Sequence, residues 1–169
     1  MKRTVLLLFA VLLTLTFADS ALADFKPQNQ LKFRLLLSNG QVIPPLGTVT
    51  NMTSKASIIF DWAMRFVTVS MQIRNNFSGV TDIHLHLGEA GAGDGVSDIV
   101  VTVKELDPPF IDRTFTVLEV VTNERVETVD SVNNIASLYQ AVRDGRIYVD
   151  VHTEDFPDGE IRGQIFPSR

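Results

Sequence analysis

Apolar and polar residues alternate along most of this chain, and no other feature limits its fold as strongly. A period of two residues is the period at which side chains of a β-strand point to the same face. Apolar positions follow it in residues 31–37, 67–73, 83–87, 99–103, 114–122, 147–151 and 161–165. Short strands with one apolar face are typical of antiparallel sheets. The pattern therefore predicts an all-β fold, an antiparallel, Greek-key-like β-sandwich.

Turn-forming residues separate these segments. Ser38-Asn39-Gly40 predicts a hairpin-type turn, and Pro157-Asp158-Gly159 predicts a tight connection between two strands. Residues 44–47 and 107–109 each contain two prolines, which are expected to interrupt a strand. The predicted strands are thus short and joined by short loops.

One segment, residues 131–143, has its apolar positions at helical spacing. Ser131 can cap the start of a helix there, and Asp144-Gly145 can end it. We predict a short helix that covers one open end of the sandwich.

The N-terminus has the three parts of a secretory signal peptide. Lys2 and Arg3 precede an apolar run, and Ala21-Leu22-Ala23 provides a cleavage signal. We expect residues 1–23 to be removed and residues 24–169 to form one domain, secreted to the periplasm or the extracellular space. The apolar run is too short to span a bilayer, which takes about 20 residues. Asn51 and Asn76 lie in glycosylation sequons that matter only if the source glycosylates its secreted proteins.

Composition excludes several kinds of partner and chemistry. The formal net charge of the chain is −5, and 13 basic against 19 acidic residues remain after the leader is removed. This balance argues against nucleic acid or an anionic membrane as the partner. The chain has no cysteine, which excludes thiol catalysis and cysteine-ligated zinc.

The chain has three histidines, and strand alternation assigns each of them to a polar face. His84 and His86 alternate with apolar residues of one segment, and Asp150 and His152 do the same in another. In the last segment the polar positions are Glu160, Arg162 and Gln164. If these three strands are neighbours, one outward face of the sheet carries all of these polar side chains.

Two of these stretches resemble the CHRD (chordin) domain family. The first is Ile83-His84-Leu85-His86-Leu87-Gly88 with the Gly/Ala loop after it. The second is residues 145–153 followed by Pro157-Asp158-Gly159-Glu160-Ile161-Arg162-Gly163-Gln164-Ile165. The resemblance implies an exported domain with a superoxide-dismutase-like or immunoglobulin-like fold. It does not imply enzymatic activity, because the family is not an established enzyme class.

Some properties of related proteins do not transfer to this chain. Growth-factor binding by chordins relies heavily on cysteine-rich modules, which a chain without cysteine lacks. The His-x-His motif also resembles that of copper/zinc superoxide dismutase, but the further histidines and the disulfide of that enzyme are missing. Dismutase activity is therefore not supported.

A copper or zinc site is the sharpest functional hypothesis. His84, His86 and His152 would supply imidazole nitrogens, which suit both metals. Water or a carboxylate, from Asp150, Glu89 or Asp94, would complete the coordination. We expect Gln164 or Glu160 to hold the free ring nitrogens.

The alternative is a structural module, or one that interacts with an extracellular protein or glycan, in which the histidines only stabilise the sheet. They would then bond to the backbone or to Glu160 and Arg162. Arg162 and Gly163 have a structural interpretation in either case: Arg162 can pair with a carboxylate across strands, and Gly163 allows close backbone approach.

Other motifs give weaker signals. The glycines of residues 88–95 lack the Gly-Lys-Ser/Thr ending of a phosphate-binding loop, so we interpret them as a loop beside the histidines. The acidic runs near residues 89–98 and 154–158 do not match the spacing of a calcium-binding EF-hand. No catalytic constellation is supported, and we predict a non-enzymatic binding module.

Overall fold

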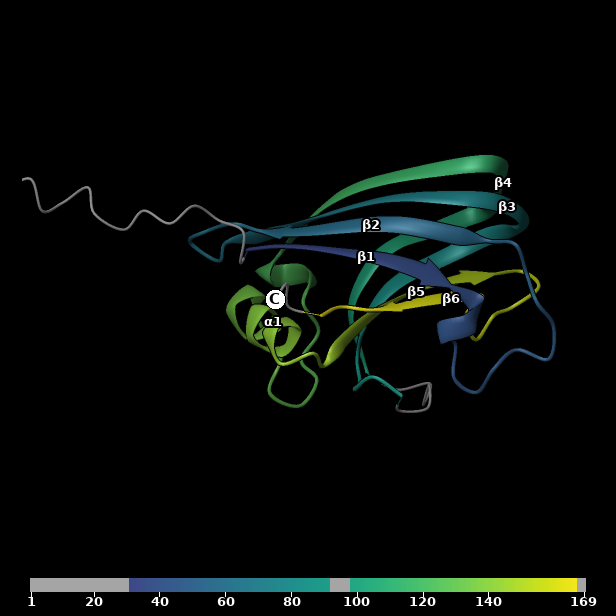
Figure 1. The fold of residues 1–169 in the computed structure, drawn as a ribbon. Helices are drawn as coiled ribbons and strands as arrows, with labels where there is room; N and C mark the ends of the chain where they lie inside the picture. The colour runs from purple at the N-terminus through teal and green to yellow at the C-terminus, as the bar shows by residue number, and fades with distance from the viewer. Residues whose placement is uncertain (1–30, 92–97, 167–169) are drawn as a thin grey trace, which may run out of the picture.

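The structure, a computed structural model, describes residues 31–91 and 98–166, without the side chains of Asn75 and Asn76. The expected signal peptide lies outside the described residues. Six strands form the domain: β1 (Lys32–Ser38), β2 (Thr53–Phe60), β3 (Phe66–Leu87), β4 (Ile99–Thr122), β5 (Ile147–Thr153) and β6 (Ile161–Gln164). One α-helix, α1 (Ile135–Arg143), and two 3-10 turns, η3 (Asn39–Gln41) and η4 (Asn123–Arg125), complete the elements named here (Figure 1).

All six strands belong to one antiparallel sheet that closes into a barrel. Their order is β2-β1-β6-β5-β3-β4, and β2 also pairs with β3. The all-β, antiparallel prediction is confirmed, but the division into the two sheets of a sandwich is corrected. The physical reason is the length of β3, whose 22 residues serve both sides of the barrel. Its residues 67–74 pair with β2 and its residues 80–87 pair with β5.

Strands β3 and β4 are each longer than the alternation predicted. Residues 67–73 and 83–87 were expected in separate strands, but they lie in one strand whose pairing with β4 shifts register between Asn76 and Asp82. Strand β4 likewise runs through Pro108 and Pro109, which were expected to break it. It ends the strand order, and an edge strand tolerates prolines because one side needs no hydrogen-bond donors.

The segment after β1 also differs from the prediction. Residues 38–40 do not form a hairpin, because η3 follows β1 and β2 begins only at Thr53. Strand β2 gave a weak sequence signal, because its inward positions start with the small residues Ser54 and Ala56. The connection from Val42 to Met52 therefore forms a loop, whose first part covers the site described below.

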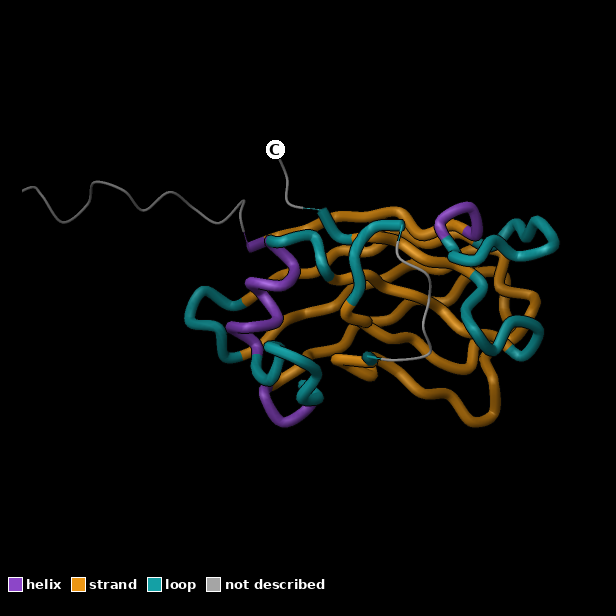
Figure 2. Tube along the Cα trace, turned by 90° about the horizontal axis from the view of Figure 1, so that it is seen from below, coloured by secondary structure: helices purple, strands orange, loops and turns teal. Residues whose placement is uncertain are grey.

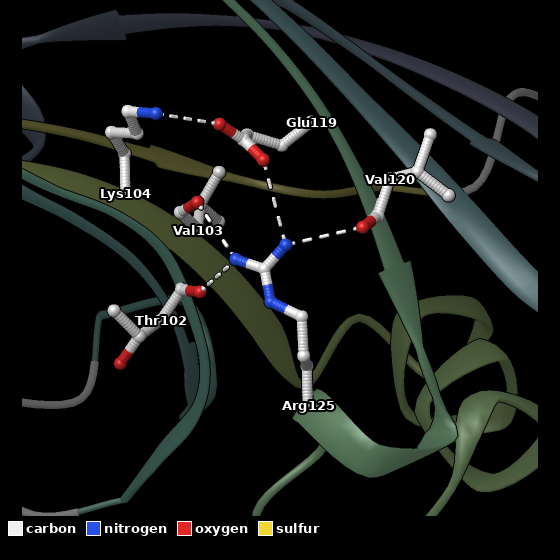
Figure 3. A network of polar contacts seen from close by, with 6 residues as sticks. All are labelled: Thr102, Val103, Lys104, Glu119, Val120 and Arg125. Carbon is white, nitrogen blue, oxygen red and sulfur yellow. Dashed lines mark hydrogen bonds and ion pairs between the residues drawn. The ribbon is translucent and has the colours of Figure 1, made fainter.

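Side-chain contacts of Arg125 and of the Lys104–Glu119 pair join the two halves of β4 (Figure 3). The Arg125 guanidinium donates to the carbonyl oxygens of Thr102 (2.8 Å) and Val103 (3.0 Å) in the first half of β4. It also donates to that of Val120 (3.1 Å) in the second half. Glu119 lies 2.9 Å from Lys104 and 3.5 Å from Arg125. This cluster satisfies carbonyl groups where β4 lacks a partner strand.

Helix α1 lies at one end of the barrel (Figures 1 and 2). The predicted short helix is confirmed and ends at Arg143, followed by the cap residue Asp144 and by Gly145 with its φ of +71°. Its cap is corrected from Ser131 to Asn134, whose side chain accepts from the Ser137 backbone N–H while the Ser137 hydroxyl accepts from the Asn134 N–H. Five side chains of the helix are buried: Ile135, Leu138, Tyr139, Ala141 and Val142. The Tyr139 ring packs edge-on against those of Phe33 and Phe60 and so joins the helix to the barrel core.

Candidate metal centre

Three neighbouring strands bring the predicted residues together. Strand β5 lies between β3 and β6. In register, His84 on β3 is opposite Asp150 on β5, and Asp150 is opposite Arg162 on β6. His152 is opposite Asp82, one step along the same face. The adjacency on which the histidine hypothesis depends is therefore confirmed.

The three imidazoles and the Asp150 carboxylate converge on one point. The Nδ1 atom of His84 lies 3.1 Å from Nε2 of His152. The carboxylate of Asp150 lies 3.1 Å from Nε2 of His86 through one oxygen and 3.1 Å from Nε2 of His152 through the other. One ligand atom from each of the four residues lies within 4.8 Å of the others. Two ligands of a tetrahedral zinc ion, each about 2.0–2.1 Å from it, lie about 3.3 Å apart, so these spacings suit one ion.

The cluster is buried, although alternation places it on the outside of the barrel. The exposed fraction is 9% for His84 and 5% for both His86 and Asp150. The same cavity is lined by the cluster, by residues 42–47 of the loop after β1 and by residues 157–159 of the β5–β6 turn. The predicted face of the sheet does carry these side chains, but the two loops cover it and bury most of the cluster.

The hydrogen bond of His152 to the backbone determines which nitrogen faces the cluster. Its Nδ1 lies 2.8 Å from the carbonyl oxygen of Pro157, which can only accept, so Nδ1 carries the proton. Its Nε2 is then the nitrogen that faces His84 and Asp150. A backbone carbonyl that fixes the ring in this way is a common support for metal-binding histidines.

The charges within the cluster shift three pKa values. Burial by itself would raise the pKa of Asp150, but contacts with His152 and His86 outweigh burial and lower it to about 2. Burial disfavours protonated His152, yet the Asp150 carboxylate raises its pKa to about 8. Burial, followed by the charge on His152, lowers the pKa of His84. The cluster thus has a permanent anion among three imidazoles and favours one positive charge.

Several atoms of the cluster have no conventional hydrogen bond. Both ring nitrogens of His86 and the Oδ1 atom of Asp150 are buried without a hydrogen-bond partner of suitable geometry among the described residues. The 3.1 Å contacts within the cluster therefore satisfy His86 Nε2 and Asp150 Oδ1 only in part. A cation at the centre of the cluster would satisfy His86 Nε2 and Asp150 Oδ1 together.

Tyr148 and Arg162 extend the cluster along the sheet. The rings of His86 and Tyr148 stack with centroids 5.0 Å apart and an angle of 5° between their planes. The guanidinium carbon of Arg162 lies 3.6 Å from the centroid of the Tyr148 ring on β5. Gly88 leaves room for this ring, because a Cβ there would lie 2.8 Å from Tyr148 Cε1. Sequence reasoning missed Tyr148, whose only signal was its place in the same row as Asp150 and His152.

The residues predicted to support the histidines make other contacts. Gln164 donates to the carbonyl oxygens of Gly88, Gly145 and Ile147 at 2.8–3.1 Å. Glu160 accepts a hydrogen bond from the Thr153 hydroxyl at 2.9 Å.

Of the carboxylates considered for a fourth ligand, Asp150 lies in the cluster. Glu89 is exposed, and Asp94 lies outside the described residues. Gly163 allows close approach of β1, as predicted, because a Cβ there would lie 2.8 Å from the carbonyl oxygen of Leu36.

Comparison with known proteins identifies the family. The family model of the CHRD domain matches residues 33–165, which is most of the chain. The protein therefore belongs to the CHRD domain family. No curated protein and no solved structure shows significant similarity to it. Within the described residues, the structure has no helix with the length and hydropathy needed to cross a bilayer.

Proposed function

We propose that this protein is an exported CHRD-domain module that binds one zinc or copper ion through His84, His86 and His152, with Asp150 as the fourth ligand. The convergence of four ligand atoms within 4.8 Å carries the proposal. It is supported by the buried His86 Nε2 and Asp150 Oδ1 atoms, which have ion-pair contacts at 3.1 Å but no hydrogen bond of good geometry, and which a cation would satisfy.

The donor set favours these metals over hard cations. Imidazole suits zinc and copper, whereas calcium and magnesium take mainly oxygen ligands. The cluster offers three nitrogens and one carboxylate, and His152 is already oriented by the carbonyl of Pro157. Removal from water also strengthens the attraction between the Asp150 carboxylate and a cation.

Export and a non-enzymatic role belong to the same proposal. Lys2, Arg3, the apolar run and Ala21-Leu22-Ala23 support secretion with cleavage after Ala23. The CHRD family is found outside the cell and is not an established enzyme class. We therefore propose extracellular binding, with any macromolecular partner being a protein or glycan.

One observation favours a purely structural role instead. His152 and Asp150 lie 3.1 Å apart, and their pKa values shift in the directions of an ion pair. A proton on His152 can therefore supply the positive charge without any metal. In that case the histidines stabilise the sheet, and the module acts through other surfaces.

Calorimetric titration with zinc and with copper separates the two candidates. We expect one ion per chain with a dissociation constant of about micromolar or tighter in the wild type, and at least about 100-fold weaker binding in His84→Ala/His86→Ala. Thr68→Ala/Ser70→Ala, a double change in the other half of β3, is the matched control and should bind as the wild type does. Circular dichroism checks that both variants fold. Wild-type binding no tighter than about millimolar, together with loss of stability in the histidine variant without metal, would support the structural role.

A further inference from the structure

A cavity opens directly above the cluster and has two kinds of wall. Its volume is about 520 Å³, and all four cluster side chains line it. The lining also includes apolar groups of the loop after β1, among them Val42, Pro45 and Leu46, and Ile99 at the start of β4. Sites for small molecules are typically about 300–1,000 Å³, mostly apolar and supplied with a few polar groups. The cavity fits that description.

Access to the cluster distinguishes it from a metal site with a purely structural role. Structural zinc sites are enclosed by their four protein ligands, whereas zinc that a ligand can reach is able to expand from four ligands to five. The side chain of His152 is still 13% exposed, and every cluster residue reaches the cavity surface. An ion held here would therefore face the cavity, where an external ligand can reach it.

The charges around the cavity restrict what that ligand can be. Besides Asp150, the lining includes Asp82, paired in register with His152, and Asp158 on the β5–β6 turn. Together with the Arg162 guanidinium, which lies over Tyr148 beside Asp150, these three carboxylates balance the charge of a divalent ion. The loaded site therefore has no net positive charge to attract an anion, and a neutral nitrogen donor is favoured.

We propose that the cavity binds a small neutral nitrogen heterocycle, which coordinates the metal through its nitrogen and packs an apolar group against Leu46 and its neighbours. The proposal rests on the metal site proposed above and specifies the class of ligand that this site takes. The nitrogen provides the bond to the metal, and burial of the apolar group provides most of the selectivity, because contact with apolar side chains removes that group from water.

The test compares three probes on zinc-loaded protein by calorimetry: imidazole, 1-benzylimidazole and benzoate. We expect 1-benzylimidazole to bind at least about tenfold more tightly than imidazole, and benzoate to bind more weakly than either. Metal-stripped protein should bind none of them measurably. Equal affinity for the two imidazoles, or a preference for benzoate, would overturn the proposal.

A variant of the apolar wall locates the effect. Leu46→Ser should keep its zinc but reduce the preference for 1-benzylimidazole to about threefold or less. Leu36→Ser is the matched control, since Leu36 is 63% exposed on β1 and does not line the cavity. A Leu46→Ser protein that keeps both its metal and the tenfold preference contradicts the proposal. Failure of the wild type to take up zinc would instead contradict the proposed metal site, so the two failures are distinguishable.

Discussion

The outward side chains of β3 are partly exposed to solvent in its first half and mostly buried in its second half. In the first half, Thr68, Ser70 and Gln72 point outward and are partly exposed. In the second half, His84 and His86 occupy the equivalent outward positions and are buried. The difference lies in the loops that cover the second half, because both halves alternate with the same period. The alternation determines the face of a residue, and the loops determine its solvation.

The charges of the two outer faces also differ. Around the first half, the outward positions of β1, β2 and β3 include the cations Lys32, Arg34, Lys55 and Arg74. Three of them line a shallow groove with neighbouring hydroxyl and amide groups. Around the second half, carboxylates and imidazoles face a covered cavity. Water screens the charges of the first face, whereas burial in the second shifts the pKa values of Asp150 and His152.

The largest effect is expected where β1 approaches β6 beside the covered half. Gly163→Val would place a Cβ 2.8 Å from the Leu36 carbonyl oxygen, with Leu35 and Leu37 at 3.0–3.1 Å. The new side chain could fit only if the β1 backbone and the core leucines moved apart, so we expect the free energy of unfolding to fall by at least about 3 kcal/mol. Urea denaturation measures this. Gly47→Ala, which meets nothing within 4 Å, is the control. A loss below about 1 kcal/mol at Gly163 would show that the covered half is loosely packed.

The next effect is stabilisation by metal, which should be confined to the second half of β3. Zinc at 100 times its dissociation constant should add about 2.7 kcal/mol to the free energy of unfolding and raise the melting temperature by several degrees. Thermal melts of Thr68→Ala/Ser70→Ala should show the same rise. Equal stabilisation of His84→Ala/His86→Ala would locate the metal elsewhere.

The third effect is a pH dependence of the metal-free protein. The pKa of His152 rises from 6.5 to about 8 on folding. The stabilisation that protonated His152 gives the folded state is therefore fully present below pH 6.5 and is lost as the pH rises through 8. This difference in pKa corresponds to about 2 kcal/mol. The pKa of Asp150 falls from 3.8 to about 2, so its contribution is present above pH 3.8 and is lost as the pH falls through 2. The lowered pKa of His84 affects stability only below pH 6.5.

Urea midpoints between pH 6 and 9 test this dependence. Asp150→Asn should flatten the decline between pH 6.5 and 8, because it removes the carboxylate that raises the pKa of His152. An unchanged slope in Asp150→Asn would mean that another group causes the decline.

The chain pattern alone predicted a large part of the site. The alternation placed His84 and His86 on the polar side of one strand and Asp150 and His152 on the polar side of another, because two-residue periodicity is a local property of strands. The stretches that resemble the CHRD family placed these strands in one domain. That β3, β5 and β6 are neighbours had to be assumed, because pairing between distant segments leaves no local signal in the sequence.

The remaining features depend on contacts between distant segments. Closure of the barrel requires β2 to pair with β3 and β1 with β6, and no single segment specifies either pairing. The loop that covers the cluster contains prolines, and from the sequence these prolines predicted only the end of a strand. Asn134 replaces Ser131 as the helix cap because Ser137 completes a reciprocal pair of hydrogen bonds with it. A serine earlier in the segment has the same propensity but lacks that partner.

The smallest effect is expected on the exposed half of β3. Thr68→Ala and Gln72→Ala should each change the free energy of unfolding by less than about 0.5 kcal/mol, because substitutions at such surface positions remove little packing. Urea denaturation at pH 7 is sufficient. A loss above about 1.5 kcal/mol would show that this half is also held by specific contacts, and the contrast between the two faces would disappear.

X-ray absorption at the zinc edge, on zinc-loaded protein without a histidine tag, detects the ligands of the proposed metal centre. We expect three imidazole nitrogens and at least one oxygen, all about 2.0–2.2 Å from the metal. We also expect loss of imidazole scattering in His84→Ala/His86→Ala. A spectrum dominated by oxygen ligands, with at most one imidazole and no change in that variant, would contradict a metal centre built from His84, His86, Asp150 and His152.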